Sequence, residues 1–213
     1  MKRNPIGAQL ADLIRTEIVH ERIPSDTHMV EDALADRFDV SRGPVRDALK
    51  ALSAEGLLVS KRRGYYVKGV SPKDIEDLYA LRGAIEKLAF ELAIENSDEG
   101  SWGSADQALA GMVEAANEGS WHDFARHDLE FHGHYYVLSN NSRLLAVWEQ
   151  YRPLFGAIID VTNEQDEDLH PSAEDHRLLL QDSRHGNTAE VIARLTSHLD
   201  GSRDRMLRRL VHE

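Results

Sequence analysis

One carboxylate and three imidazoles lie on the inward-facing sides of predicted helices in the second half of the chain. Asp128 and His132 are four residues apart, and a step of about 100° per residue places both within an apolar helix face. His176 shares a face with leucines of a later helix, and His198 lies at the shoulder of an apolar face in the last one. Such a donor set suits a divalent transition metal of the Zn, Ni or Mn class.

The same pattern has a simpler interpretation. A carboxylate and an imidazole on an apolar face must be paired or must coordinate something, because an uncompensated buried charge is costly. Asp128 and His132 could therefore form a salt-bridged core pair, with His176 and His198 hydrogen-bonded to the backbone. Periodicity alone leaves both interpretations open.

A second set of residues indicates contact with nucleic acid. Ser41 is a favourable helix N-cap, and Pro44 falls in the first turn, where a missing N–H costs least. Arg42 and Arg46 project from one face near the start of this helix. Another face of the helix is apolar and carries Val45, Ala48, Leu49 and Leu52. This layout is typical of a recognition helix, although a capped surface helix with two solvated arginines also fits.

The elements around this helix form a recognisable unit. A short helix over 29–38 precedes it across a tight connection, which makes a helix-turn-helix. Gly56 follows the second helix as a C′ residue, and strands over 57–60 and 65–68 flank the basic turn 61–64. An amphipathic helix over 6–22 supplies a third support. The prediction is a winged helix-turn-helix.

The remainder of the chain is predicted to be entirely helical. Gly69 to Pro72 marks a boundary, so we expect a DNA-binding domain over 1–69 and an all-α antiparallel helical bundle over 70–213. The fold class is therefore mainly α, with a β-hairpin wing. Helices are predicted over 72–96, 104–118, 120–139, 141–162, 170–185 and 187–211.

The stretch from Glu31 to Val67 resembles the DNA-binding domain of the GntR family of bacterial transcription regulators. The resemblance is carried by Leu34-Ala35, Val40-Ser41-Arg42, Pro44-Val45-Arg46, Ala48-Leu49, Leu52, Glu55-Gly56-Leu57 and Gly64. It implies that operator DNA is contacted by Ser41, Arg42, Gly43, Pro44, Arg46, Arg62, Arg63 and Gly64. The family often has arginine where this chain has Asp32, so either that contact is lost or Asp32 orients a neighbouring arginine.

The second domain resembles the helical FCD effector domain of the FadR-type branch of these regulators. The marks are Asp74 through Leu81-Arg82 with Glu86, Asp128 through His132, Asn141 with Leu144, Glu174-Asp175-His176 and His198-Leu199. The resemblance implies a divalent metal held by Asp128, His132, His176 and His198. It also implies an effector pocket, to which we assign Arg82, Glu86 and Asn141. Arg82 and Glu86 could equally be a helical ion pair.

Charge is distributed unevenly along the chain. The formal net charge is −12, but residues 1–70 carry a net +2 and residues 71–213 a net −14. An acidic body would stay off DNA and leave the basic N-terminal domain to contact it. The chain has no cysteine and no run approaching the roughly 20 apolar residues of a membrane span. We therefore expect a cytoplasmic protein with no membrane partner.

These observations together predict a regulator rather than an enzyme. We expect a homodimeric repressor that binds double-stranded, two-fold operator DNA and senses a small organic acid at the metal. One alternative is a metal-dependent hydrolase, which would use the metal to activate water. Another is a DNA-binding protein whose metal is purely structural.

Overall fold

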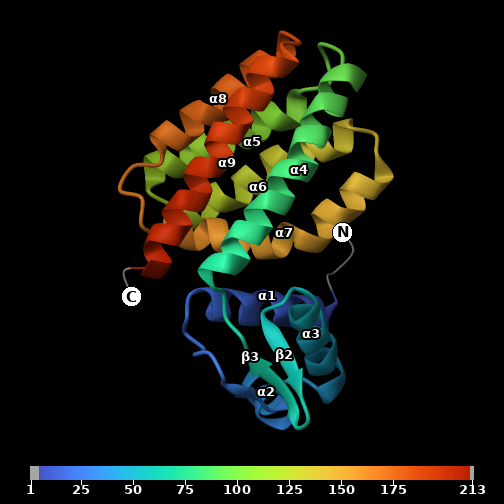
Figure 1. Cartoon of the computed structure of the whole chain (residues 1–213), viewed down its shortest axis with the longest axis vertical. Helices are drawn as coiled ribbons and strands as arrows, with labels where there is room; N and C mark the ends of the chain where they lie inside the picture. The colour runs from blue at the N-terminus through green and yellow to red at the C-terminus, as the bar shows by residue number, and fades with distance from the viewer. Residues whose placement is uncertain (1–4, 212–213) are drawn as a thin grey trace. The chain divides into compact units, whose positions relative to one another are not determined.

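The computed structural model describes residues 5–211, and Figure 1 shows the course of the chain. The chain divides into two compact units between Ser71 and Pro72. The predicted boundary, between residues 69 and 70, lies slightly earlier. No helix among the described residues is both long and apolar enough to cross a bilayer.

The N-terminal unit packs three helices around one apolar core. These are α1 (Ile6–Val19), α2 (Glu31–Phe38) and α3 (Arg42–Ala54). The predicted apolar face of α3 is buried completely: Val45, Ala48, Leu49 and Leu52 are all 0% exposed. They pack largely against α1, because α1 and α3 are the closest-packed helix pair of this unit. The face of α3 that carries the arginines is left at the surface.

A small antiparallel sheet completes this unit and includes one strand that the sequence pattern did not predict. Its strands are β1 (His28–Met29), β2 (Leu58–Lys61) and β3 (Gly64–Val67), in the order β1-β3-β2. Met29 was predicted to begin a helix, but it pairs with Tyr65 of β3 and its side chain is buried. Lys61, predicted to lie in the turn, pairs with Gly64 instead. Two residues alone could not signal a strand whose pairing partner lies far along the chain.

Two helix ends also differ from expectation. The first helix ends at Val19 rather than at residue 22, because Glu21 adopts a left-handed backbone with φ of 57° and the chain reverses there. Ser41 occupies the N-cap position of α3, but its side chain makes no capping hydrogen bond. Gly56 follows the C-cap Glu55 with φ of 81°, which confirms its predicted C′ role.

A buried arginine joins α1 to the end of α3. Arg15 is 4% exposed and donates from Nε and Nη2 to the two carboxylate oxygens of Glu55, each at 2.6 Å. Its Nη1 donates to Asp12, also at 2.6 Å. A forked pair of this kind fixes orientation as well as distance. The helix that precedes the helix-turn-helix is thereby held in register with the recognition helix.

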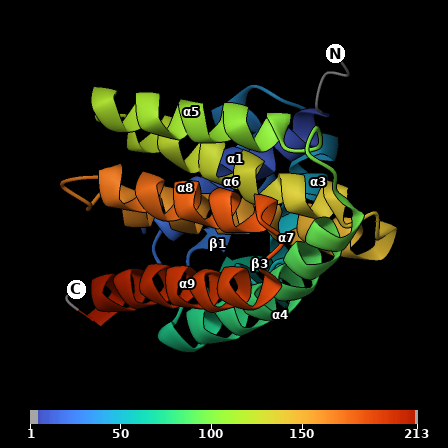
Figure 2. The same cartoon turned by 90° about the horizontal axis from the view of Figure 1, so that it is seen from above.

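The second unit is a helical bundle, shown from above in Figure 2. Every described helix bound in this unit lies within one residue of its predicted position. The helices are α4 (Pro72–Asn96), α5 (Gly103–Glu118), α6 (Trp121–Leu138), α7 (Ser142–Asn163), α8 (His170–Arg184) and α9 (Thr188–Val211). Helix α6 packs against α4, α5 and α7, while α9 packs against α4, α7 and α8. Residues of α4, α6, α8 and α9 therefore meet in the interior.

Candidate metal centre and nucleic-acid interface

Four donor side chains converge inside the bundle. Asp128 and His132 come from α6, His176 from α8 and His198 from α9. One ligand atom from each residue can be chosen so that all four lie within 4.8 Å of one another. His132 and His176 are fully buried, Asp128 is 5% exposed, and His198 is partly buried. The structure thus brings together the four residues singled out by their helix faces.

Hydrogen bonds to the outer ring nitrogens orient two of these histidines. Nδ1 of His132 lies 2.7 Å from Oε2 of Glu86, and Nδ1 of His176 lies 2.7 Å from the carbonyl oxygen of Ser172. Both acceptors require a proton on Nδ1, which leaves Nε2 of each ring to face the cluster. Metal-binding histidines are held in this way by carboxylates and backbone carbonyls.

The two Nε2 atoms face each other at 3.3 Å. Because Nδ1 of each ring is the donor in these hydrogen bonds, the lone pairs of the two Nε2 atoms would repel each other unless a proton or a cation lies between them. Asp128 adds negative charge here: its Oδ2 is 3.3 Å from Nε2 of His176. Its Oδ1 is buried and has no hydrogen-bond partner. Two facing nitrogens and an unsatisfied carboxylate oxygen are the donor chemistry that a divalent transition metal fits.

Electrostatics keep the donors in forms that can bind a cation. Burial opposes ionisation of Asp128, but the hydrogen bond and charge of His176, together with His132 and Arg82, hold the pKa of its carboxyl well below the usual range. Burial and the neighbouring imidazoles of His176 and His132 lower the pKa of His198 well below 6.5. His198 is therefore neutral at neutral pH, as a ligand must be.

A buried ion pair adjoins the cluster. Nε of Arg82 donates to Oε1 of Glu86 at 2.6 Å, and the two side chains are 1% and 0% exposed. Burial opposes the charge on Glu86, but Arg82 and then His132 keep the pKa of its carboxyl below the ordinary value. Nη2 of Arg82 lies 4.0 Å from Oδ1 of Asp128 and has no hydrogen-bond partner. The chain Arg82–Glu86–His132 therefore links α4 to the donor set.

The contact between Glu86 and His132 was not anticipated. Glu86 was assigned to an effector pocket. Its spacing of four residues from Arg82 also predicted an ion pair between these two residues of one helix. Its second oxygen binds a residue of another helix, 46 positions away, and no spacing rule reports such a pair. The hydroxyl of Tyr136 was missed altogether: it is buried without a hydrogen-bond partner, and burial together with Glu86 raises its pKa.

Asn141 has a different local role from the one expected. Its side-chain oxygen accepts hydrogen bonds from the backbone N–H groups of Arg143 and Leu144, at 3.1 and 3.2 Å, and so caps α7. This capping role explains an asparagine at the start of the helix, and no bound ligand is needed to explain it. Its assignment to an effector site stays a prediction.

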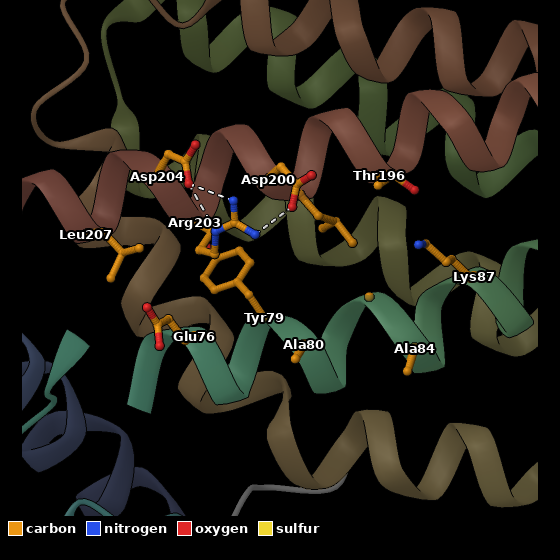
Figure 3. Close-up of a pocket in the computed structure, with 12 residues that line it drawn as sticks. Glu76, Tyr79, Ala80, Ala84, Lys87, Thr196, Asp200, Arg203, Asp204 and Leu207 are labelled. Atoms are coloured by element: carbon orange, nitrogen blue, oxygen red, sulfur yellow. Dashed lines mark hydrogen bonds and ion pairs between the residues drawn. The ribbon is translucent and has the colours of Figure 1, made fainter. Parts of the chain in front are cut away.

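A surface groove of about 660 Å³ lies between α4 and α9 (Figure 3). Arg203 projects into it from α9 and is ion-paired there with Asp200 at 2.7 Å and Asp204 at 2.8 Å. Glu76 and Tyr79 line the facing wall on α4. None of the four cluster residues lines this groove. The groove is therefore distinct from the donor cluster.

The candidate DNA-contacting residues all lie in the N-terminal unit, in two places. Ser41, Arg42, Gly43, Pro44 and Arg46 lie in and just before the first turns of α3. Arg42 and Arg46 are exposed and ion-paired: Nε of Arg42 is 2.6 Å from Asp32, and Nε of Arg46 is 2.7 Å from Glu31. Both carboxylates come from α2. Of the two alternatives for Asp32, the structure therefore favours orientation of a neighbouring arginine.

The second group is the wing formed by β2 and β3. Arg62 and Arg63 make the turn between these strands, and Gly64 starts β3 with φ of 120°, a conformation that favours glycine. The ring of His28 stacks on Tyr66 at 4.6 Å, and its Nε2 lies 2.9 Å from the carbonyl oxygen of Arg63. The cationic tip is thus tied to the neighbouring strand.

Comparison with known protein families gives two matches that follow the two units. Residues 6–67 match the profile of bacterial regulatory proteins of the gntR family. Residues 77–201 match the FCD domain, which is more than half of the chain.

Individual relatives agree with these matches. The gluconate operon transcriptional repressor of Bacillus subtilis (strain 168) is 27% identical over 205 residues, which cover 94% of this chain and 84% of that protein. Relatives of this kind are named as transcription regulators and not as enzymes, in agreement with the expectation of a non-enzymatic protein.

Two solved structures share the fold. E. coli McbR/YncC superposes with a TM-score of 0.78 at 18% identity, covering 97% of this chain and 99% of that one. The metal-free FCD domain of TM0439 superposes with a TM-score of 0.54 at 17% identity, covering 68% of this chain and 99% of that one. The predicted fold class, mainly α with an N-terminal winged helix-turn-helix, is confirmed.

The buried pair predicts a large effect of a small substitution. Glu86→Gln keeps the shape of the side chain but leaves the guanidinium of Arg82 buried without its carboxylate. We expect the free energy of unfolding of metal-free protein to fall by about 3 kcal/mol. Urea unfolding followed by circular dichroism measures this. The control Glu95→Gln removes an exposed charge from the same helix and should change stability by less than about 0.5 kcal/mol. Equal stability of the two variants would contradict the prediction.

Proposed function

This chain belongs to the GntR family of bacterial regulatory proteins and carries an FCD domain, and we propose that it is a repressor whose operator binding responds to a metal-bound organic acid. The observation that carries the proposal is the convergence of Asp128, His132, His176 and His198 inside the bundle, with two Nε2 atoms facing each other at 3.3 Å. We take the protein to act as a homodimer on a two-fold operator, since repeated half-sites match a two-fold protein.

A divalent transition metal would be held by Asp128, His132, His176 and His198. When bound, the ion supplies positive charge at the centre of an otherwise electron-rich cluster and open coordination positions for an acid. Glu86 and the carbonyl of Ser172 would hold two of the imidazoles in the ligating tautomer. Imidazole and carboxylate donors suit several metals of this class, and elemental analysis identifies the ion.

The effector we propose is a small carboxylate bound beside Arg82. Nη2 of Arg82 and Oδ1 of Asp128 are buried atoms without hydrogen-bond partners, and they lie 4.0 Å apart. A carboxylate would accept from the guanidinium and would compensate the positive charge of a neighbouring ion. Gluconate is a reasonable first candidate, since one relative is named for the gluconate operon.

The DNA-binding part of the proposal rests on α3 and the wing. Arg42 and Arg46 are exposed at the start of a helix that has another face fully buried. A helix held in this way presents its N-terminal side chains to base edges in the major groove. Arg62 and Arg63 would contact the phosphate backbone or the minor groove from the wing. The effector would act only through a difference in its affinity for the DNA-bound and free forms.

Loss of two ligands should abolish metal binding. We expect wild-type protein, after loading with excess metal and desalting, to retain one ion per chain by elemental analysis. His132→Ala combined with His176→Ala should retain none, because only two donors remain. The matched control is His185→Ala, which removes an exposed histidine of the same bundle. Stoichiometric metal in the double variant would place the site elsewhere.

Removal of one recognition arginine should weaken specific DNA binding. Arg46→Ala is expected to reduce the affinity for a duplex selected by the wild-type protein by about 1–3 kcal/mol at fixed salt. Arg22→Ala, an exposed arginine in the loop after α1, serves as the control. Fluorescence anisotropy at several salt concentrations gives both affinities. Unchanged specific affinity of the Arg46 variant would refute its assignment.

Small acids should stabilise the metal-loaded protein through Arg82. We expect gluconate or another acid of a small-carboxylate panel to raise the Tm of wild-type protein and to alter its operator affinity. Arg82→Lys keeps the positive charge but loses the forked donor, and should lose most of the Tm shift. Arg203→Lys in the α4–α9 groove is the control. If no acid changes Tm or operator affinity while metal removal lowers Tm, the metal is purely structural.

A further inference from the structure

The arginines assigned to DNA contact do not stand alone on the recognition helix. Each is paired through the same atom with a carboxylate of the preceding helix: Nε of Arg42 with Asp32 and Nε of Arg46 with Glu31. We propose that Asp32 and Glu31 are positioning residues that fix these two arginines for base recognition and thereby set operator specificity. This inference rests on the proposed DNA-binding function and assigns it two residues on α2.

The geometry of the two pairs is repeated. Glu31 and Asp32 are consecutive in the first turn of α2, while Arg42 and Arg46 are one turn apart on α3. The distances are 2.6 Å for Arg42 to Asp32 and 2.7 Å for Arg46 to Glu31, typical of charge-assisted hydrogen bonds. One turn of α2 therefore carries a carboxylate for each arginine.

Each carboxylate binds Nε of its arginine, so the two terminal nitrogens of the guanidinium stay available for DNA. A guanidinium has five N–H donors in a fixed plane, and a carboxylate on Nε orients that plane. The two terminal nitrogens form the end-on fork that matches O6 and N7 of guanine. Arg42 and Arg46 can therefore keep the Nε contact while they bind a base edge. The side chain enters the groove already oriented, so less conformational freedom is lost on binding.

The same carboxylates disfavour DNA that offers no matching base. Asp32 is 59% exposed at the side of a helix that faces the operator in the proposed arrangement. A carboxylate near the phosphate backbone is repelled, and it competes with phosphates for its arginine. Only a favourable hydrogen bond to a base edge offsets this repulsion. Asp32 is thus expected to lower non-specific affinity and to raise the ratio of specific to non-specific affinity.

These pairs are not explained by stability of the fold. Arg42 and Asp32 are both more than half exposed, and exposed ion pairs contribute little to stability. The buried fork from Arg15 to Glu55 joins α1 to the end of α3, and α2 is anchored by its buried Leu34. A substitution at Asp32 should therefore leave Tm nearly unchanged, which separates positioning from folding.

The experiment compares Asp32→Asn with Asp36→Asn. Both remove one exposed negative charge from α2, but Asp36 forms no ion pair within residues 5–211. The probes are a duplex that the wild-type protein selects from a random-sequence library and a shuffled duplex of equal length. We expect Asp32→Asn to lower the ratio of specific to shuffled affinity by about threefold to tenfold at fixed salt. Asp36→Asn should change both affinities by the same factor.

A double-mutant cycle with Arg42→Ala completes the test. If Asp32 acts by orienting Arg42, then Asp32→Asn should not lower the ratio further in the Arg42→Ala background. The analogous cycle joins Glu31→Gln with Arg46→Ala. An unchanged ratio in Asp32→Asn, or a loss that persists in full without Arg42, overturns the positioning role. Failure of the wild-type protein to select any sequence would instead overturn the proposed DNA-binding function.

Discussion

Charge buried inside the C-terminal bundle is the constraint on which the rest of that unit depends. Arg82, Glu86, Asp128, His132 and His176 are all at most 5% exposed. Isolated buried charges would cost more than the fold can supply, so each of these groups must be paired, neutral or bound to a cation. Hydrogen bonds satisfy the outer side of this network, at Glu86 and at the carbonyl of Ser172. The inner side, where two Nε2 atoms and one carboxylate oxygen meet, is complete only with a positive charge at its centre.

Helix periodicity predicted much of this arrangement from the sequence. The apolar faces of α6, α8 and α9 identified Asp128, His132, His176 and His198, and the bundle helices lie within one residue of their predicted bounds. A period of 3.6 residues reports which side of a helix is buried, and capping residues report where it begins. It does not report which residue of another helix lies opposite. The sequence pattern therefore could not predict the hydrogen bond between Glu86 and His132, nor the strand formed by His28 and Met29.

At the surface of the N-terminal unit, too, the sequence did not predict which residues of two helices meet. The spacing of Arg42 and Arg46 identified an arginine-bearing face, yet the sequence left the role of Asp32 undecided. Its contact with Arg42 joins two helices, and the connection between them turns at Asp39, which has a left-handed φ of 50°. The fold thereby places an acidic turn of α2 beside a basic turn of α3. The resulting surface has little net charge at the point assigned to DNA contact, so specificity there depends on geometry more than on attraction to phosphate.

The junction at Ser71 and Pro72 has a consequence for how regulators of this kind diversify. Each unit has its own hydrophobic core, and proline at the first position of α4 has no backbone N–H that must find a partner. A crossover between genes at this point would keep the residues of each core together in one product. The winged helix-turn-helix unit and the helical bundle can thus be recombined in a gene without dividing either core between two products.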